Sequence, residues 1–246
     1  MSKSRSGVSL TGNGKGPSTL AQLARLRQRA YRLFSQSLLY PHDRRLTGLA
    51  LTGAELDAQS HLWAAFAFFP QWSALLERIK KLDYADARSL QVKYVSTFLV
   101  NRAGIPCPLY ESAYLGEDPS LGGYLMAELE SEYAQMGLSS PANSAEPPDH
   151  AAVQMEFMYF VCGREAEAWE CEELQLGSFY LARECDFLHR HLGWWFREFA
   201  RKVMTEDADG LFAAQARAAD AFLVHDIDLI SAMLQRFESF PVAEVP

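Results

Sequence analysis

Hydrophobic positions recur at three- and four-residue steps along almost the whole chain from Leu20 onward. The first run carries Leu23, Leu26 and Leu33 on one face and stops at Pro41, a period typical of an amphipathic helix. Short apolar segments follow at 61–69 and 72–82. Further helices are predicted over about 89–100, 122–137, 149–171, 175–192, 194–205 and 209–238.

The segment after Asp149 differs from the other predicted helices because it is apolar around most of its circumference. Its apolar residues do not fall on one stripe, since they are Val153, Met155, Phe157, Met158, Phe160 and Val161. This breadth indicates a helix at the centre of a bundle. No segment alternates apolar and polar residues as a half-buried strand would. We therefore predict an all-α, single-domain bundle of about nine to ten helices, with a long polar loop at about 137–149.

The N-terminal segment differs in composition from the rest of the chain. Residues 1–19 are rich in Ser, Gly and Thr, so we predict a disordered tail there and one helical domain over 20–246. No apolar run of about eighteen residues is present to span a membrane. No apolar segment follows Lys3 and Arg5, so the N-terminus does not resemble a secretory signal. These features predict a cytoplasmic protein without membrane insertion.

Charge narrows the class of partner. The formal net charge is −8, and the tail contributes Lys3, Arg5 and Lys15 without an acidic residue, so the remaining chain is more acidic still. Nucleic acid is not expected as a partner because its phosphates require clustered Lys and Arg. A cationic ligand or peptide suits an acidic surface better.

The residues with chemical potential concentrate in the segment Glu146-Pro147-Pro148-Asp149-His150, directly before the central helix. Asp149 and His150 are sequence neighbours, so on a helix they point about 100° apart and cannot form the acid–base pair of a catalytic triad. Ser112 lacks a Gly-x-Ser-x-Gly elbow. We therefore predict no catalytic residue.

Metal binding is not expected either. Two other histidines, His189 and His191, lie two residues apart and would diverge on a helix, and the chain contains no His-Glu-x-x-His pattern. We expect the histidines to be solvated or to cap helices. Trp194 and Trp195 are expected to be core anchors rather than part of a cofactor site.

Ligand binding is the remaining interpretation of these two segments. Tyr110 and Tyr114 stand four residues apart and would share one face of a helical turn beside Glu111. The same tyrosines could equally pack and cap a rigid loop. The roles of Asp149 and Glu146 are also undecided, because each carboxylate could accept hydrogen bonds from N–H groups at the start of its own helix or bind a cationic partner.

The segments Pro108-Leu109-Tyr110-Glu111-Ser112-Ala113-Tyr114-Leu115 and Glu146 to His150 resemble motifs of the TorD/DmsD/NarJ-type family of redox-enzyme maturation chaperones. The resemblance covers roughly Leu20 to Phe237. It implies a cytoplasmic, system-specific chaperone with no enzymatic activity and no cofactor of its own. Its partner would be the catalytic subunit of a molybdenum oxidoreductase.

The resemblance also implies how such a chaperone acts. It binds the N-terminal or twin-arginine leader of its client and delays export until the molybdopterin cofactor is inserted. The sequence leaves open whether the chain is a monomer or a helix-swapped homodimer, for which the loop at 137–149 could act as the hinge. The implied peptide-binding residues are Tyr110, Glu111, Tyr114, Glu146, Pro148, Asp149 and His150. On this basis the double substitution Asp149→Ala with His150→Ala is expected to weaken leader binding with little change in thermal stability.

A second class of function remains open on the residues alone, namely a helical carrier or enzyme that binds a pterin or a nucleotide. The absence of a glycine-rich phosphate loop argues against nucleotide hydrolysis. A mass spectrum of the native protein would separate the two, because a carrier would retain a stoichiometric small molecule.

Overall fold

A computed structural model describes residues 19–82, 87–100, 104–116, 119–138 and 146–239. The predicted disordered tail, apart from Thr19, and residues 139–145 of the predicted polar loop lie outside the described residues. No helix in the described part of the chain is both long and apolar enough to cross a membrane.

The described ranges contain nine α-helices, which confirms the predicted all-α fold. Shorter helical turns occur at Ser60–Leu62, Val95–Leu99 and Glu111–Tyr114. The α-helices are α1 (Thr19–Ser37), α2 (Asp43–Ala58), α3 (Phe69–Lys80), α4 (Ala87–Tyr94), α5 (Pro119–Gln135), α6 (Ala151–Glu170), α7 (Leu174–Arg190), α8 (Leu192–Glu206) and α9 (Leu211–Ser239).

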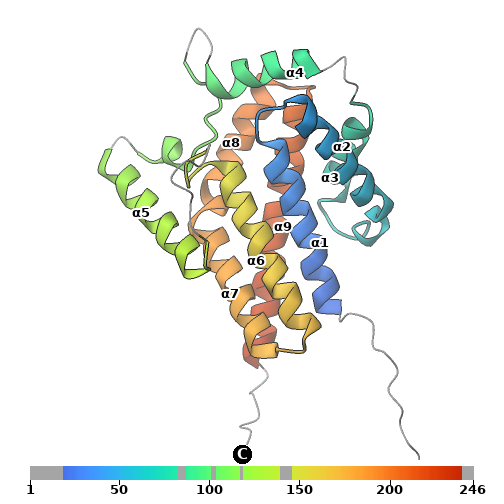
Figure 1. The fold of residues 1–246 in the computed structure, drawn as a ribbon, viewed down its shortest axis with the longest axis vertical. Coiled ribbons are helices and arrows are strands. Elements are labelled where there is room, and N and C mark those ends of the chain that lie inside the picture. Colours follow the sequence, from blue (N-terminus) through green and yellow to red (C-terminus); the bar gives the residue numbers. More distant parts are fainter. Residues whose placement is uncertain (1–18, 83–86, 101–103, 117–118, 139–145, 240–246) are drawn as a thin grey trace, which may run out of the picture.

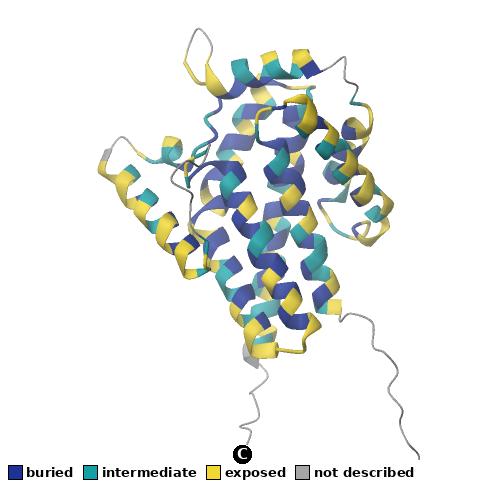
Figure 2. Cartoon of the chain, in the orientation of Figure 1, coloured by how far each residue is buried: buried dark blue, intermediate teal, exposed yellow. Residues whose placement is uncertain are grey.

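The long helices α1, α6, α7, α8 and α9 form the bundle (Figure 1). Helices α2 and α3 cover one side of it, α5 lies at the opposite side, and α4 lies across one end. Helix α6 packs along α1 and α7, and its side chains are buried around most of its length (Figure 2). The predicted central helix is therefore confirmed.

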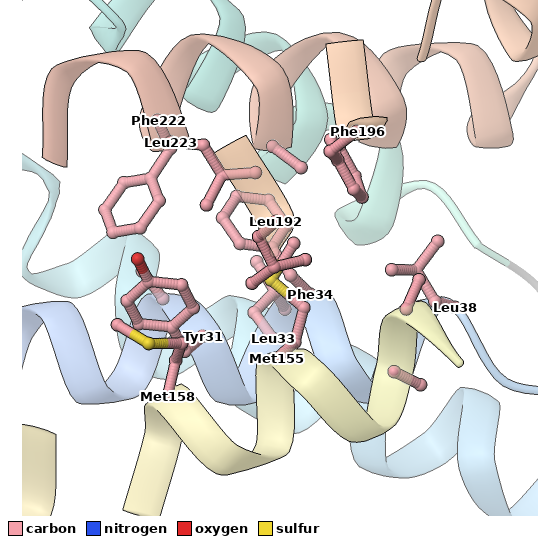
Figure 3. Close-up of a cluster of buried hydrophobic side chains, with 14 of the residues drawn as sticks. Tyr31, Leu33, Phe34, Leu38, Met155, Met158, Leu192, Phe196, Phe222 and Leu223 are labelled. Atoms are coloured by element: carbon pink, nitrogen blue, oxygen red, sulfur yellow. The ribbon is translucent and has the colours of Figure 1, made fainter. Parts of the chain in front are cut away.

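The main core lies where α1 and α6 meet α8 and α9. Figure 3 shows Phe34 of α1 and Met155 of α6 facing Leu192 and Phe196 of α8, with Phe222 of α9 beside them. All five side chains are buried. Burying one such large apolar side chain contributes about 1.5–3 kcal/mol, so this cluster sets how α8 is placed on α6.

The hydrophobic pattern did not predict helix α2. His42 caps it by accepting a hydrogen bond from the Arg45 N–H at its Nδ1 (3.2 Å). Gly53 faces α3, where a Cβ atom would lie 2.7 Å from Cγ2 of Ile79. The glycine lowers helix propensity, but it lets two backbones approach closely, and tertiary packing decides the outcome.

A buried ion cluster ties four helices of the bundle together. Arg27 of α1 bonds to Glu165 of α6, Glu184 of α7 and Asp226 of α9. The Tyr31 hydroxyl also donates to Asp226, at 2.6 Å. Each of these three carboxylates is at most 1% exposed, so the guanidinium is the charge that makes their burial tolerable.

Candidate functional site

The two motif segments lie against each other as a short antiparallel bridge. Tyr110 pairs with His150. The Glu111 N–H donates to the Asp149 carbonyl at 3.0 Å, and the Ala151 N–H donates to the Leu109 carbonyl at 2.8 Å. Segments far apart in the sequence therefore form one unit at the start of α6.

His150 is the N-cap of α6. Its Nδ1 accepts a hydrogen bond from the Ala152 N–H at 3.0 Å, and such a cap satisfies one of the free donors of the first turn. Burial lowers the pKa of His150 to about 4, so the ring is neutral near pH 7 and Nδ1 is available as an acceptor. The expectation of a capping histidine is confirmed here.

Asp149 does not cap its own helix. Its Oδ2 accepts a hydrogen bond from the backbone N–H of Ser112 at 3.1 Å, and the residue is only 2% exposed. The carboxylate thus holds the turn Glu111–Tyr114 in place. Of the two roles considered from the sequence, the own-helix cap is wrong, because His150 already occupies that position.

The tyrosines do not share a face. Tyr110 precedes the turn in an extended conformation, and its ring contacts the His150 ring edge-on, with centroids 5.2 Å apart. The Tyr114 ring lies 5.2 Å from that of Trp195, and its hydroxyl donates to the Pro108 carbonyl at 3.0 Å. The prediction of a common face is wrong because the 3₁₀ turn begins only at Glu111.

Glu146 and Pro148 lie at the outer side of the bridge and are partly exposed. Glu146 Oε2 is 3.7 Å from His150 Nε2, and burial raises the pKa of Glu146 while Arg45 opposes that shift. The Pro148 carbonyl accepts a hydrogen bond from the Tyr133 hydroxyl of α5 at 2.8 Å. This contact links α5 to the motif.

Glu111 is the best-bonded buried acid of the site. The residue is fully buried, and its carboxylate accepts from the Trp194 Nε1–H at 2.7 Å, contacts His191 Nδ1 at 3.1 Å and accepts from the Gln154 side-chain amide. Gln154 in turn accepts from the Trp195 indole N–H at 3.2 Å. A buried carboxylate is tolerated only with such partners. Glu111 therefore fixes the motif turn to α6 and α8.

His191 corrects the expectation of a solvated or capping histidine. The residue is fully buried, between Glu111 and Glu132, whose Oε1 is 3.8 Å from His191 Nε2. Burial lowers the pKa of His191, but interactions with these two carboxylates outweigh it, so the pKa is raised. The raised pKa favours the protonated imidazole, whose positive charge offsets the negative charge of a carboxylate beside it.

Three residues of the site were not predicted from the sequence, namely Gln154, His191 and Trp194. The available signal was Gln154 within a mostly apolar helical run, since a fully buried amide needs hydrogen-bond partners. Trp194 was expected in the core and is 42% exposed, whereas Trp195 is buried as expected. The sequence does not indicate which of two adjacent tryptophans is exposed, because that depends on how the helix packs.

Two clusters in the described part of the chain place metal-ligating atoms within 4.8 Å of one another. In Glu128, Glu132 and His191, the Arg190 guanidinium bonds to both glutamates. In Cys162, Glu165 and Glu184, Arg27 bonds to both glutamates. An arginine thus already neutralises the carboxylates of each cluster.

Comparison with known proteins points to chaperones of reductase assembly. The chain is 28% identical to the chaperone protein TorD of Vibrio cholerae over 65% of its own length and 72% of the relative's. It is 29% identical to a perchlorate reductase assembly chaperone of Dechloromonas aromatica, over 53% of this chain and 56% of the relative. It is 28% identical to a selenate reductase assembly chaperone of Thauera selenatis, over 56% of this chain and 69% of the relative.

A solved structure shares the fold. It is a redox enzyme maturation protein from Archaeoglobus fulgidus, which superposes with a TM-score of 0.50 at 23% identity and covers 89% of this chain and 99% of the other. At this identity the likeness concerns the fold alone.

These relatives define the class as a maturation chaperone and not an enzyme. The protein-family model described as nitrate reductase delta subunit matches residues 65–201, more than half of the chain. The chain belongs to this family, and it is a TorD-type redox-enzyme maturation chaperone.

Proposed function

We propose that this protein is the system-specific chaperone of a molybdenum oxidoreductase and binds the N-terminal, twin-arginine leader of the catalytic subunit. Binding takes place in the cytoplasm and delays export until the molybdopterin cofactor is inserted. The observation that carries the proposal is the bridge between Tyr110 and His150, which joins both family-like motifs into one partly exposed surface. The same surface serves a monomer or a homodimer that exchanges helices.

Exposure divides the seven proposed peptide-binding residues into two groups. Tyr110, Tyr114, Glu146 and Pro148 are partly exposed and would contact the leader. The apolar body of the leader packs on tyrosine rings, whose polar tips tolerate water. The Glu146 carboxylate is placed to pair with a leader arginine.

The other three residues act through this surface rather than on the peptide. Glu111, Asp149 and His150 are at most 2% exposed. Their hydrogen bonds fix the turn at Glu111–Tyr114 and the start of α6. A surface held in one conformation before binding loses less entropy when the peptide docks.

Tyr110→Ala tests the contact surface. With a synthetic leader peptide that carries two adjacent arginines followed by an apolar run, we expect calorimetry to give a dissociation constant about tenfold higher than for the wild type, a loss of about 1.4 kcal/mol. The reason is the removal of an aromatic contact at the centre of the surface.

Tyr124→Ala is the matched control, because this α5 tyrosine is 74% exposed and lies outside the motif surface. It should bind the peptide like the wild type. Equal affinity of the Tyr110 and Tyr124 variants would remove Tyr110 from the site, provided that circular dichroism shows both to be folded.

A further inference from the structure

A groove runs between the start of α8 and the middle of α9, with a cavity volume of about 420 Å³. Leu223 and Ile227 contribute apolar lining from α9, and Trp194 contributes from α8. Gly193 lies at the start of α8, where a Cβ atom would come within 2.9 Å of Cδ1 of Ile227. The absence of a side chain at Gly193 therefore lets α8 approach α9 closely at this end of the groove.

The groove exposes apolar side chains at fixed positions. Trp194 is 42% exposed and Val224 is 40% exposed. The Trp194 indole is held by its hydrogen bond to the buried Glu111, so the groove adjoins the motif turn. An ordered, exposed tryptophan next to aliphatic side chains is typical of an anchor point for a partner.

Acidic side chains flank the apolar part. Asp220, Val224 and Asp228 succeed one another at four-residue steps and therefore form one row along α9. Asp220 is 3.6 Å from the 70% exposed Arg197, and Asp228 is exposed and forms no ion pair with another described residue. An exposed pair of this kind contributes little, so Asp220 can exchange Arg197 for a basic group of a partner.

We infer that the groove between α8 and α9 binds a segment of the client leader in which a large apolar side chain is flanked by basic residues. The apolar side chain lies against Trp194 and Val224, and a basic side chain pairs with Asp228. This inference rests on the proposed function and names a second contact surface for the same leader. Charge complementarity supports it, since an acidic row suits a cationic peptide and disfavours an acidic one.

Two substitutions test the groove with the leader peptide described above. Asp228→Lys reverses the charge of the row, and Val224→Glu places a charge against the apolar anchor. Both side chains are exposed, so folding should be retained. Calorimetry is expected to show binding at least tenfold weaker for each variant.

Asp186→Lys on α7 and Val92→Glu on α4 are the matched controls, because both residues are exposed and lie outside the groove. They should change the dissociation constant by less than twofold. Groove variants that bind like these controls would overturn the inference and leave the proposed function standing. Absence of binding by the wild type would overturn both.

Sedimentation of the wild type and of Asp228→Lys tests the alternative that the groove binds a second copy of the chain. The expected result is the same oligomeric state for both proteins. A wild-type dimer that dissociates in the variant would assign the groove to self-association and overturn the inference.

Discussion

Replacing Arg27 with alanine is expected to lower the free energy of unfolding by about 3 to 5 kcal/mol, because three buried carboxylates lose their cation. Arg27 Nε is 2.5 Å from Asp226, Nη1 is 2.7 Å from Glu165, and Nη2 also bonds to Glu184. Urea unfolding followed by circular dichroism measures this loss. The four side chains come from α1, α6, α7 and α9, so the variant loosens the bundle as a whole.

Arg25→Ala is the matched control on the same helix. Arg25 pairs with Glu170 at 2.8 Å, but the two side chains are 32% and 38% exposed. Exposed pairs contribute about 0 to 1 kcal/mol, so this variant should unfold almost like the wild type. Equal losses for Arg25→Ala and Arg27→Ala would contradict the assigned role of the buried cluster.

The loss at Arg27 should depend on pH. Burial raises the pKa of Glu165 and, more strongly, of Glu184, while Arg27 opposes both shifts. Without the guanidinium these pKa values rise further above their unfolded values. A raised carboxyl pKa favours the folded state at acid pH, and that contribution is lost as pH rises through the folded pKa. The difference from wild type should therefore be smaller near pH 5 than near pH 8.

The double variant Asp149→Ala with His150→Ala is expected to lose about 1.5 to 5 kcal/mol of stability. Removing the His150 cap costs about 0.5 to 2 kcal/mol. Removing the Asp149 carboxylate leaves the Ser112 N–H without its acceptor, which costs about 1 to 3 kcal/mol. The structure thus replaces the expectation of an unchanged melting temperature, because both side chains are buried and bonded. Urea unfolding measures the change.

Asp186→Ala with His189→Ala provides the control for that double variant. It removes the same two residue types from exposed positions of α7, where surface substitutions change stability by about 0.5 kcal/mol or less. A motif variant as stable as this control would show that the hydrogen bonds of Asp149 and His150 contribute nothing to the fold.

Much of the fold could be predicted because it depends on local periodicity. The helical runs at α1, α6 and α9 follow from apolar spacing, and the burial of α6 follows from the breadth of its apolar surface. Helix α2 was missed although Leu46, Leu49 and Leu56 share its buried face. Gly48 and Gly53 lower the helix propensity of this segment. The close packing of Gly53 on α3 stabilises the helix instead.

The sequence indicated that the two motif segments would face each other, but it did not indicate which side-chain contacts they make. The two motifs do meet, but the partner of Asp149 lies 37 residues away at Ser112, and a partner of Glu111 lies 80 residues away at His191. Such pairs depend on how α6 and α8 pack, which spacing along the chain does not encode. For the same reason Tyr110 and Tyr114 were expected on one face and point to different partners.

Titration of the wild-type protein tests most directly whether this chaperone recognises a basic leader peptide. Calorimetry would compare the twin-arginine leader peptide with the same peptide in which both arginines are replaced by alanine. We expect saturable binding of one leader peptide per chain, and we expect the two alanines to weaken it at least tenfold. No binding of the leader, or equal binding of the two peptides, would contradict this expectation.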